Sequence, residues 1–414
     1  LAGGTIAAGS NTALGSGVFD VTGSAALDAS AAVALANDVA IGAGATLTNP
    51  GSNDLTLNGV VSGANGALAK TGAGTLTLNG ENTYGGGTTL SGGAIRVGSN
   101  AALGAGALNV NGAAGLLSDG SYALDNAISL GANLTAGGAG NMTLNNAIAG
   151  SGTLIKSGAG SLTLNGVNTH AATRLDSGLL VLGNNAALGA GLLSVTGDAA
   201  LEGAGNLALD NAVEVTAGAD LTLAQTHDAQ LLGTIGGAGG LIVSGPGTTL
   251  TLAGANAYQG GTQLNGGNLR LGQDASLGTG ALLVNADASL SGAQPGPALT
   301  VANGVTLSAA LNVTGDRDIT LSGGIDGAGA LAKSGASTLT LDAANSYAGG
   351  TTLSAGVLRA GNDAALGTGA LTVDGAATLA SDQAVALANN VVLGQTLTLD
   401  ATNGLRLNGE ISGA

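Results

Sequence analysis

The sequence predicts an all-β fold, a β-solenoid in which short parallel strands wind into stacked coils. Three observations lead to this prediction. The apolar residues are small or aliphatic, since 44% of the 414 residues are hydrophobic but only 1% are aromatic. Short segments alternate polar and apolar residues with period two, as half-buried strands do. The same phrases also return at steps of about 88 residues, as they do in repeat proteins.

The strand signal is clearest at Thr75–Leu78. There Leu76 and Leu78 would face a core while the two threonines face water. Asn79 and Gly80 then supply a turn, because both residue types accept positive φ angles. The same strand and turn recur in "SLTLNG" and "TLTLDA". Glycine interrupts nearly every window long enough for an amphipathic helix, so we expect no long helices.

The repeat is anchored on the phrase "NTYGGGTTLSGG", which begins at Asn82. It returns as "NTHAATRLDSG" at Asn168, "NAYQGGTQLNGG" at Asn256 and "NSYAGGTTLSAG" at Asn345, at steps of 86, 88 and 89 residues. The leucine of an ALG or SLG phrase occurs five times, at Leu14, Leu103, Leu188, Leu277 and Leu366. We therefore expect a single continuous solenoid over residues 1–414, with repeat copies at 1–81, 82–167, 168–255, 256–344 and 345–414.

The repeat length sets the expected number of coils. A solenoid coil uses on the order of 20 to 24 residues, so one copy would make about four coils and the chain roughly 18 to 20. Strands stacked about 4.8 Å apart would then give a rod roughly 90 Å long. Ala, Val, Leu and Ile would fill its narrow interior. A propeller fits less well, because its blades use about 40 to 50 residues each.

Charge and composition exclude several function classes. The chain has 9 Lys and Arg against 25 Asp and Glu, a net charge of -16, which opposes binding to nucleic acid or to anionic lipid. It has no cysteine, so disulfides and thiolate metal sites are impossible. No apolar stretch reaches the roughly 18 residues that a membrane helix needs, and we expect no membrane insertion by this segment. No signal peptide precedes Leu1, so we expect a segment of a longer chain.

One stretch carries a resemblance to a known family. "KTGAGTLTLNGENTYGGGTTLSGGAIRVG", residues 70–98, resembles the passenger-associated transport repeat of bacterial autotransporters. Its marks are Lys, Gly-x-Gly, Leu-x-Leu, Asn-x-Tyr and Gly-Gly-Thr, in that order. Lys70, Lys156 and Lys333 hold the Lys, and Val243 replaces it in the remaining full copy. The second copy departs most, with His170 in place of the Tyr.

The resemblance implies a right-handed parallel β-helix that is extracellular, either secreted or anchored at the outer membrane of a Gram-negative bacterium. It also implies an outer-membrane barrel outside this segment. The function we expect is a non-enzymatic scaffold or stalk that supports adhesion or aggregation and folds as it is secreted. Its partners would be a host cell, the matrix, a neighbouring cell or a second copy of the chain. No cofactor is expected.

Two alternatives remain open at the level of sequence. The chain could be a subunit of an extracellular fibre assembled by end-to-end stacking, because exposed strand edges invite further strands. It could also be a polysaccharide-degrading β-helix enzyme, which needs paired carboxylates. Asp316 and Asp318 in "TGDRDITL" are two residues apart and could share a strand face, with Arg317 opposite. Most other acids lie in turn phrases, where Asp makes local hydrogen bonds.

The rare aromatic and imidazole side chains have both structural and functional readings. The repeat's tyrosines could stack on glycans, but we expect them to fill turns beside glycines. His227 has no second His or Cys near it in sequence, so we expect an exposed turn residue and no metal site. We expect no catalytic, cofactor-binding or metal-binding residue. The structural motif residues are Lys70, Asn82, Tyr84, Lys156, Asn168, His170, Asn256, Tyr258, Lys333, Asn345 and Tyr347.

Overall fold

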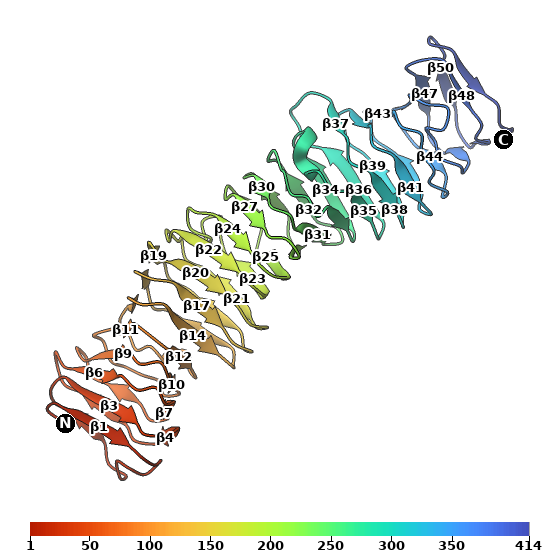
Figure 1. Ribbon diagram of the computed structural model, residues 1–414. Coiled ribbons are helices and arrows are strands. Elements are labelled where there is room, and N and C mark those ends of the chain that lie inside the picture. The colour runs from red at the N-terminus through yellow and green to blue at the C-terminus, as the bar shows by residue number, and fades with distance from the viewer. Residues whose placement is uncertain (414) are drawn as a thin grey trace. The chain divides into compact units, whose positions relative to one another are not determined.

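A computed structural model describes residues 1–413 of the chain and confirms the all-β solenoid (Figure 1). Short parallel strands wind through about 20 coils. The coils group into two compact units, residues 1–204 and the residues from 205 onward, each of which is a solenoid in its own right. That they continue as one solenoid stays a prediction. Among the described residues the one helix is a short 3-10 turn, η1 (Asp274–Leu277).

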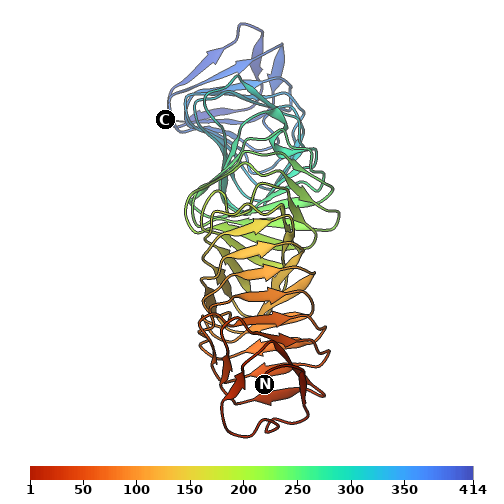
Figure 2. The ribbon, with the colours of Figure 1, turned by 90° about the vertical axis from the view of Figure 1, so that its left-hand side faces the viewer.

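In the first unit the coils have three sides (Figure 2). The first side holds β1 (Thr5–Ala8), β3 (Ala25–Ala29), β6 (Thr46–Asn49), β9 (Ala67–Lys70), β11 (Thr88–Leu90), β13 (Leu108–Val110), β16 (Ile128–Leu130) and β19 (Ile148–Gly150). The second side holds β4 (Val33–Leu35), β7 (Leu55–Leu57), β10 (Thr75–Leu78), β12 (Ala94–Val97), β14 (Ala114–Ser118), β17 (Leu134–Gly137), β20 (Thr153–Lys156), β22 (Ala172–Leu175) and β24 (Leu193–Val195). The third side holds two sheets, first β2 (Phe19–Val21), β5 (Val39–Ile41) and β8 (Val61–Ser62), then β15 (Tyr122–Leu124), β18 (Met142–Leu144), β21 (Ser161–Leu164), β23 (Gly178–Leu182) and β25 (Ala199–Gly203).

The second unit is also three-sided. One side holds β26 (Leu207–Leu209), β29 (Ala229–Leu231), β32 (Thr249–Leu252), β34 (Gly267–Leu271), β36 (Ala288–Gly292), β39 (Leu311–Val313), β42 (Leu331–Lys333), β44 (Thr351–Leu353), β46 (Leu371–Val373), β49 (Val391–Leu393) and β52 (Ile411–Gly413). The next holds β27 (Val213–Val215) and β30 (Ile235–Gly236), then β37 (Leu299–Val301), β40 (Ile319–Leu321), β43 (Thr338–Leu341), β45 (Val357–Ala360), β47 (Ala377–Ser381) and β50 (Leu397–Asp400). The last holds β28 (Asp220–Ala224), β31 (Gly240–Ser244), β33 (Thr262–Leu264), β35 (Leu282–Val284), β38 (Val305–Leu307) and β41 (Ile325–Gly327), then β48 (Val385–Leu387) and β51 (Leu405–Leu407).

The period-two pattern decides which side chains enter the interior. Leu76 of β10 is paired in register with Leu55 on one neighbouring strand and Ile95 on the other, and all three are buried. Thr75 and Thr77 on the same strand point outward and are partly exposed. Each buried Leu or Ile stabilises its coil by about 1.5 to 3 kcal/mol. Aliphatic rows of this kind form the core that the composition predicted.

Each full copy contains two coil sides without a strand. In the first copy, residues 82–84 stack on β8, because the Thr83 amide donates to the Val61 carbonyl. Residues 100–105 stack in turn on residues 82–84, because the Ala105 amide donates to the Tyr84 carbonyl. We term these two segments the strandless sides of a copy. They end the sheet that contains β8, and a new sheet begins with β15.

Consecutive copies interrupt different sides of the coil. At the second copy, residues 168–170 stack on β19 and end the sheet of the first side instead. From β9 in the first copy to β20 in the second, the chain makes eleven strands and two strandless sides. These thirteen sides, at three sides per coil, amount to four and one third coils. The repeat is therefore not a whole number of coils, and each copy moves its motif one side further around.

The second unit follows the same rule. In the third copy residues 256–258 stack on β30, whereas in the fourth copy residues 345–347 stack on β41. These two strands belong to different sides of the coil. From β31 to β42 the chain again makes eleven strands. The one-third step is thus a property of the repeat in both units.

Candidate functional site

The motif asparagine bridges three consecutive coils. Asn82 Oδ1 accepts a hydrogen bond from the Val61 amide at 2.7 Å, and its Nδ2 donates to the Ala102 carbonyl at 2.6 Å. A side-chain amide has the same donor and acceptor as a peptide group. It therefore continues the hydrogen-bond ladder across a side that has no strand. Asn168, Asn256 and Asn345 make the same two bonds, at 2.8 and 2.6 Å, 2.8 and 2.7 Å, and 2.8 and 2.6 Å.

The motif tyrosines fill the interior behind the strandless sides. Tyr84, Tyr258 and Tyr347 are fully buried, and burial raises the pKa of the latter two to about 12. Each hydroxyl lies 2.5 to 2.7 Å from the hydroxyl of a threonine four residues later. No face of these rings is available to stack on a glycan.

Glycine packs directly against each tyrosine ring. Gly104 has φ +63, and a Cβ built on it would lie 2.4 Å from the Tyr84 carbonyl oxygen and 3.0 Å from the ring. Gly278 and Gly367 have the same relation to Tyr258 and Tyr347. In these three copies the ALG or SLG phrase therefore ends in glycine because the preceding coil comes too close for any side chain.

His170 replaces tyrosine with the same polar contact. Its Nε2 lies 2.8 Å from Thr173 Oγ1, and Thr173 donates to the Leu188 carbonyl at 3.1 Å. Since the threonine proton is used in that second bond, Nε2 carries the ring proton and donates it. Burial lowers the pKa of His170 below its usual 6.5, which keeps the imidazole neutral. A neutral, fully buried ring fits the expected structural role.

All three lysines of the chain are motif lysines, and all are buried. Lys156 Nζ donates to the carbonyls of Ser157, Gly158 and Ser177 at 2.8 to 3.0 Å. Lys333 makes three equivalent bonds, and Lys70 bonds the Gly72 carbonyl. Burial lowers the pKa of Lys156 and Lys333 to about 8. The ammonium groups of Lys156 and Lys333 thus tie the turns of adjacent coils together through backbone carbonyls.

The third copy replaces this tie in another way. Val243 is buried where the other copies have Lys, and the following turn, which contains Pro246, is one residue longer. The Thr248 hydroxyl donates to the Gly245 carbonyl at 2.8 Å, as does the Thr248 amide at 3.1 Å. A neutral hydroxyl on a longer turn therefore satisfies a carbonyl that lysine bonds in the other copies.

A second set of asparagines ties the ALG turn to the next coil, and our sequence analysis missed it. Asn126 Nδ2 donates to the carbonyls of Gly104 and Gly106 at 2.9 and 2.6 Å. The phrases "ALAND", "ALDNA", "TVANG" and "ALANN" carry the signal, because their Asn follows an alternating strand. Asn37, Asn303 and Asn389 make the same pair of bonds.

Many acidic side chains cap the strands of the next coil. Asp54 Oδ1 accepts from the Thr75 amide at 2.7 Å, just where β10 begins. Asparagine serves the same purpose, as at Asn133 and the Thr153 amide. Asp38, Asp228, Asp274, Asp287, Asp318 and Asp363 make equivalent bonds. Much of the negative charge is therefore spread over turns and used by the backbone.

The carboxylates considered for catalysis do not lie on a strand. Asp316 and Asp318 are exposed in the turn before β40, and Arg317 between them is buried. The expectation of a shared strand face is therefore wrong, because the turn extends to residue 318. The Arg317 guanidinium donates to the carbonyls of Gly272, Ala293 and Pro297 and so holds the irregular connection between β36 and β37.

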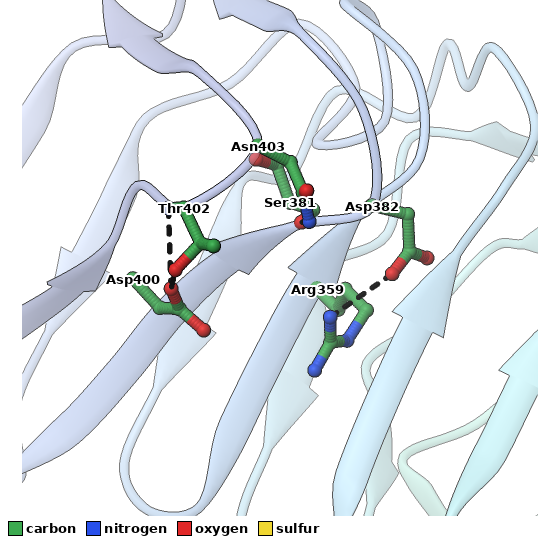
Figure 3. Close-up of polar contacts among 6 residues, drawn as sticks. All are labelled: Arg359, Ser381, Asp382, Asp400, Thr402 and Asn403. Carbon is green, nitrogen blue, oxygen red and sulfur yellow. Dashed lines mark hydrogen bonds and ion pairs between the residues drawn. The ribbon is translucent and has the colours of Figure 1, made fainter.

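Several other ionisable groups have local partners. His227 is exposed beside Thr226, and within residues 1–413 no three His, Cys, Asp or Glu residues gather where they could hold a metal ion. Figure 3 shows Arg359 paired with Asp382 at 3.0 Å, and the fold also pairs Arg96 with Asp119. Asp400 accepts two bonds from Thr402, which hold its pKa below the usual range (Figure 3). No described helix is long and apolar enough to cross a membrane.

Comparison with known proteins agrees with this geometry. The passenger-associated transport repeat family matches residues 68–97, 154–182, 241–271 and 331–360. Each match contains the buried Lys or Val and the Asn-x-Tyr or Asn-x-His corner. The chain is also 32% identical over 171 residues to the adhesin BmaC autotransporter of Brucella suis, which covers 36% of this chain. The chain matches only 4% of that relative's length. No solved structure matches it.

The four family matches coincide with the four full motifs described above. Their residues lie in the interior and at the turns, where they hold coils together. The third match includes the variant turn with Val243. The chain is therefore a β-solenoid that carries four passenger-associated transport repeats and is similar in part to an autotransporter adhesin.

Proposed function

We propose that this segment is a non-enzymatic extracellular scaffold, the stalk of an autotransporter-like surface protein that supports adhesion or aggregation. The observation that carries the proposal is the use of the motif's polar groups. Amide, hydroxyl and ammonium groups of the motif bond inside the solenoid from one coil to the next, as in Asn82 to Ala102, Thr88 to Leu103 and Lys156 to Ser177. Residues selected for such bonds serve the length and rigidity of the solenoid. The proposal places the chain at the bacterial surface, anchored or released.

Folding coupled to secretion is part of the same proposal. Each coil bonds only its neighbours, so it can form as soon as the previous coil is in place. Asn82, for example, accepts from the coil before it and donates to the coil after it. A chain that leaves a pore in an extended form could therefore fold coil by coil outside the cell.

The scaffold role can be tested on the complete surface protein displayed by its bacterium. Residues 82–167 are removed in frame, which joins two homologous corners and leaves every remaining coil a natural neighbour. We expect unchanged surface amounts but weaker attachment to host cells and matrix, or slower settling of bacterial aggregates. Duplicating residues 168–255 in the shortened protein should restore attachment and settling. Equal attachment and equal settling at matched surface amount would contradict the stalk.

An enzyme assay gives a separate check. The purified chain should release no reducing ends and no unsaturated products from acidic polysaccharides, because Asp316 and Asp318 lie in an exposed turn and share no strand face. Product formation that disappears in the Asp316→Asn, Asp318→Asn double variant would contradict the non-enzymatic role.

A further inference from the structure

The second unit has a surface cavity of about 580 Å³ at the variant turn of the third copy. Its lining includes Pro246 and Gly247 from the lengthened turn, and Asn268, Ser289 and Asn312 from three successive coils. Cavities of a few hundred to about 1,000 Å³ are the usual size of small-ligand sites. The cavity is thus large enough to hold part of a ligand, and it coincides with the place where the repeat departs from its pattern.

Three polar side chains form a row across this cavity. Asn268 of β34 pairs in register with Ser289 of β36, which pairs with Asn312 of β39. The three residues therefore lie side by side at the strand spacing of about 4.8 Å. They are partly exposed and point to the outside of the coil. An amide, a hydroxyl and a second amide are presented in line along the solenoid.

The other copies do not have this row. At the position of Asn268 the first, second and fourth copies have Ala94, Leu179 and Val357. In the fourth copy Val357 is paired with Thr378, and Thr378 with Thr398. The fold therefore does not require an amide at this position, and the third copy has gained one.

Several side chains that line the cavity keep hydrogen-bonding atoms free, unlike those of the motif. Within residues 1–413, the Asn268 amide and the Ser289 hydroxyl make no hydrogen bond to the protein, and Asn312 uses only its oxygen, which accepts from Ser334. Asp287 uses one carboxylate oxygen to cap the Ala310 amide and leaves the other free. By contrast, the 330 Å³ cavity at the first motif is lined by Asn82 and Asn126, whose amides already bond the backbone.

We propose that this cavity is a binding site for a neutral, hydroxyl-rich saccharide. Amide N–H donors require acceptors on the ligand, and the free oxygens of Asn268 and Asp287 require donors. Sugar hydroxyls supply both. A cationic peptide side chain would leave the amide donors unused, and an acidic glycan would meet Asp287 and a chain of net charge -16. The Pro246 ring adds an apolar edge against which sugar C–H groups can pack.

The test uses the purified full chain on an array of neutral, sialylated and sulfated glycans, followed by calorimetric titration of the best neutral oligosaccharide. The double variant Asn268→Val, Asn312→Thr carries at these two positions the residues found in the fourth copy, Val357 and Thr398, so its fold should be intact. It should bind about tenfold more weakly or worse, because two hydrogen bonds are lost. The control is the Thr320→Val, Thr340→Val double variant, which changes paired outward-facing residues of β40 and β43 on a different side of the coil and should bind as the natural chain does.

Three results would overturn the site: no neutral glycan bound above background, binding of sialylated or sulfated glycans alone, or equal affinity in the Asn268 and Asn312 variant. Loss of binding in the control variant would also overturn it, because the effect would then not be local. This inference goes beyond the stalk function. Failure of glycan binding would leave the outcome of the copy-deletion experiment unchanged, so the two proposals can fail separately.

Discussion

His170 Nε2 donates to the hydroxyl of Thr173 at 2.8 Å, in the place where Tyr84 meets Thr88 in the first copy. The histidine copy has one residue fewer between ring and hydroxyl, so the corner closes around a smaller ring. The polar contact is kept although both the ring and the spacing change. The corner therefore depends on a hydrogen bond to threonine inside the coil more than on tyrosine itself.

The buried histidine predicts a pH dependence of stability. Because the pKa of His170 is lower in the folded chain than its usual 6.5, the unfolded chain binds a proton first as the pH falls. The free energy of unfolding should therefore decrease between about pH 7.5 and about pH 5.5. Urea unfolding at several pH values, monitored by circular dichroism, measures this decrease.

The two histidines provide a matched pair for this test. His170→Gln should remove most of the decrease, whereas His227→Gln should leave it in place because His227 is exposed. A decrease of the same size in both variants would show that other groups cause it.

Gly104 of the ALG turn should not tolerate substitution, because the ring of Tyr84 lies against it. Gly104 and Gly15 occupy equivalent ALG turns with φ +63 and +68, but a Cβ on Gly15 would meet nothing within 4 Å. Alanine at either position costs about 1 to 3 kcal/mol from the backbone conformation. At Gly104 the contact with Tyr84 should add about 1 to 3 kcal/mol. Urea unfolding of Gly104→Ala and Gly15→Ala measures the difference, and equal losses would mean that the ring yields freely.

The bridging asparagine should not tolerate a carboxylate. In Asn82→Asp the donor to the Ala102 carbonyl is lost, and a buried charge faces that carbonyl instead. We expect a loss of about 3 to 5 kcal/mol in the free energy of unfolding at neutral pH, partly recovered at acidic pH. Asn109→Asp is the control, because Asn109 is exposed on β13 and makes no side-chain hydrogen bond within the described residues. Similar losses in the two variants would contradict the bridging role.

The lysines should not react with amine-modifying reagents in the native state. Since all three are buried, a short treatment with an amine-acetylating reagent should modify only the N-terminal amine, and mass spectrometry of peptides can locate the label. Arg270→Lys adds an amine at an exposed position and serves as an internal reference. Labelling of Lys156 or Lys333 at the reference rate without denaturant would contradict their burial.

The same lysines predict that stability rises at alkaline pH. The pKa of Lys156 and Lys333 is about 8 in the folded chain and 10.5 when exposed, so between these values the unfolded chain holds more protons. The free energy of unfolding should rise by at most about 1.4 kcal/mol per pH unit for each lysine. The measurement should stop near pH 10, where tyrosines of the unfolded chain begin to ionise. A flat profile in the natural chain, or a rise that survives Lys156→Met with Lys333→Met, would contradict this.

The strands and the repeat could be predicted from the sequence because both depend on local pattern. Leu76 and Leu78 are buried as the alternation indicates, and Tyr84 fills a turn beside glycines as expected. The burial of Lys70 could not be predicted in this way. A charged side chain is ordinarily assigned to the surface, and the carbonyls that surround its ammonium group belong to the backbone, which leaves no trace in composition.

The contacts between coils could also not be predicted from the sequence. Arg317 bonds the Gly272 carbonyl across 45 residues, and no spacing rule in the sequence connects the two. The number of coils in a repeat depends on how many coil sides lack a strand. This number is visible only in the structure, where residues 82–84 and then residues 100–105 stack between β8 and β15.

The one-third step of the repeat has a mechanical consequence. Within each unit, successive strandless sides fall on different sides of the coil, so interruptions never line up along one edge. A force that bends the unit toward any one direction meets at most one interrupted sheet per pair of copies, while the sheet on another side runs past it without a break. The strandless sides of successive copies are thus staggered around the coil. If the coils separate at one strandless side, the separation meets a continuous sheet before it reaches the next one.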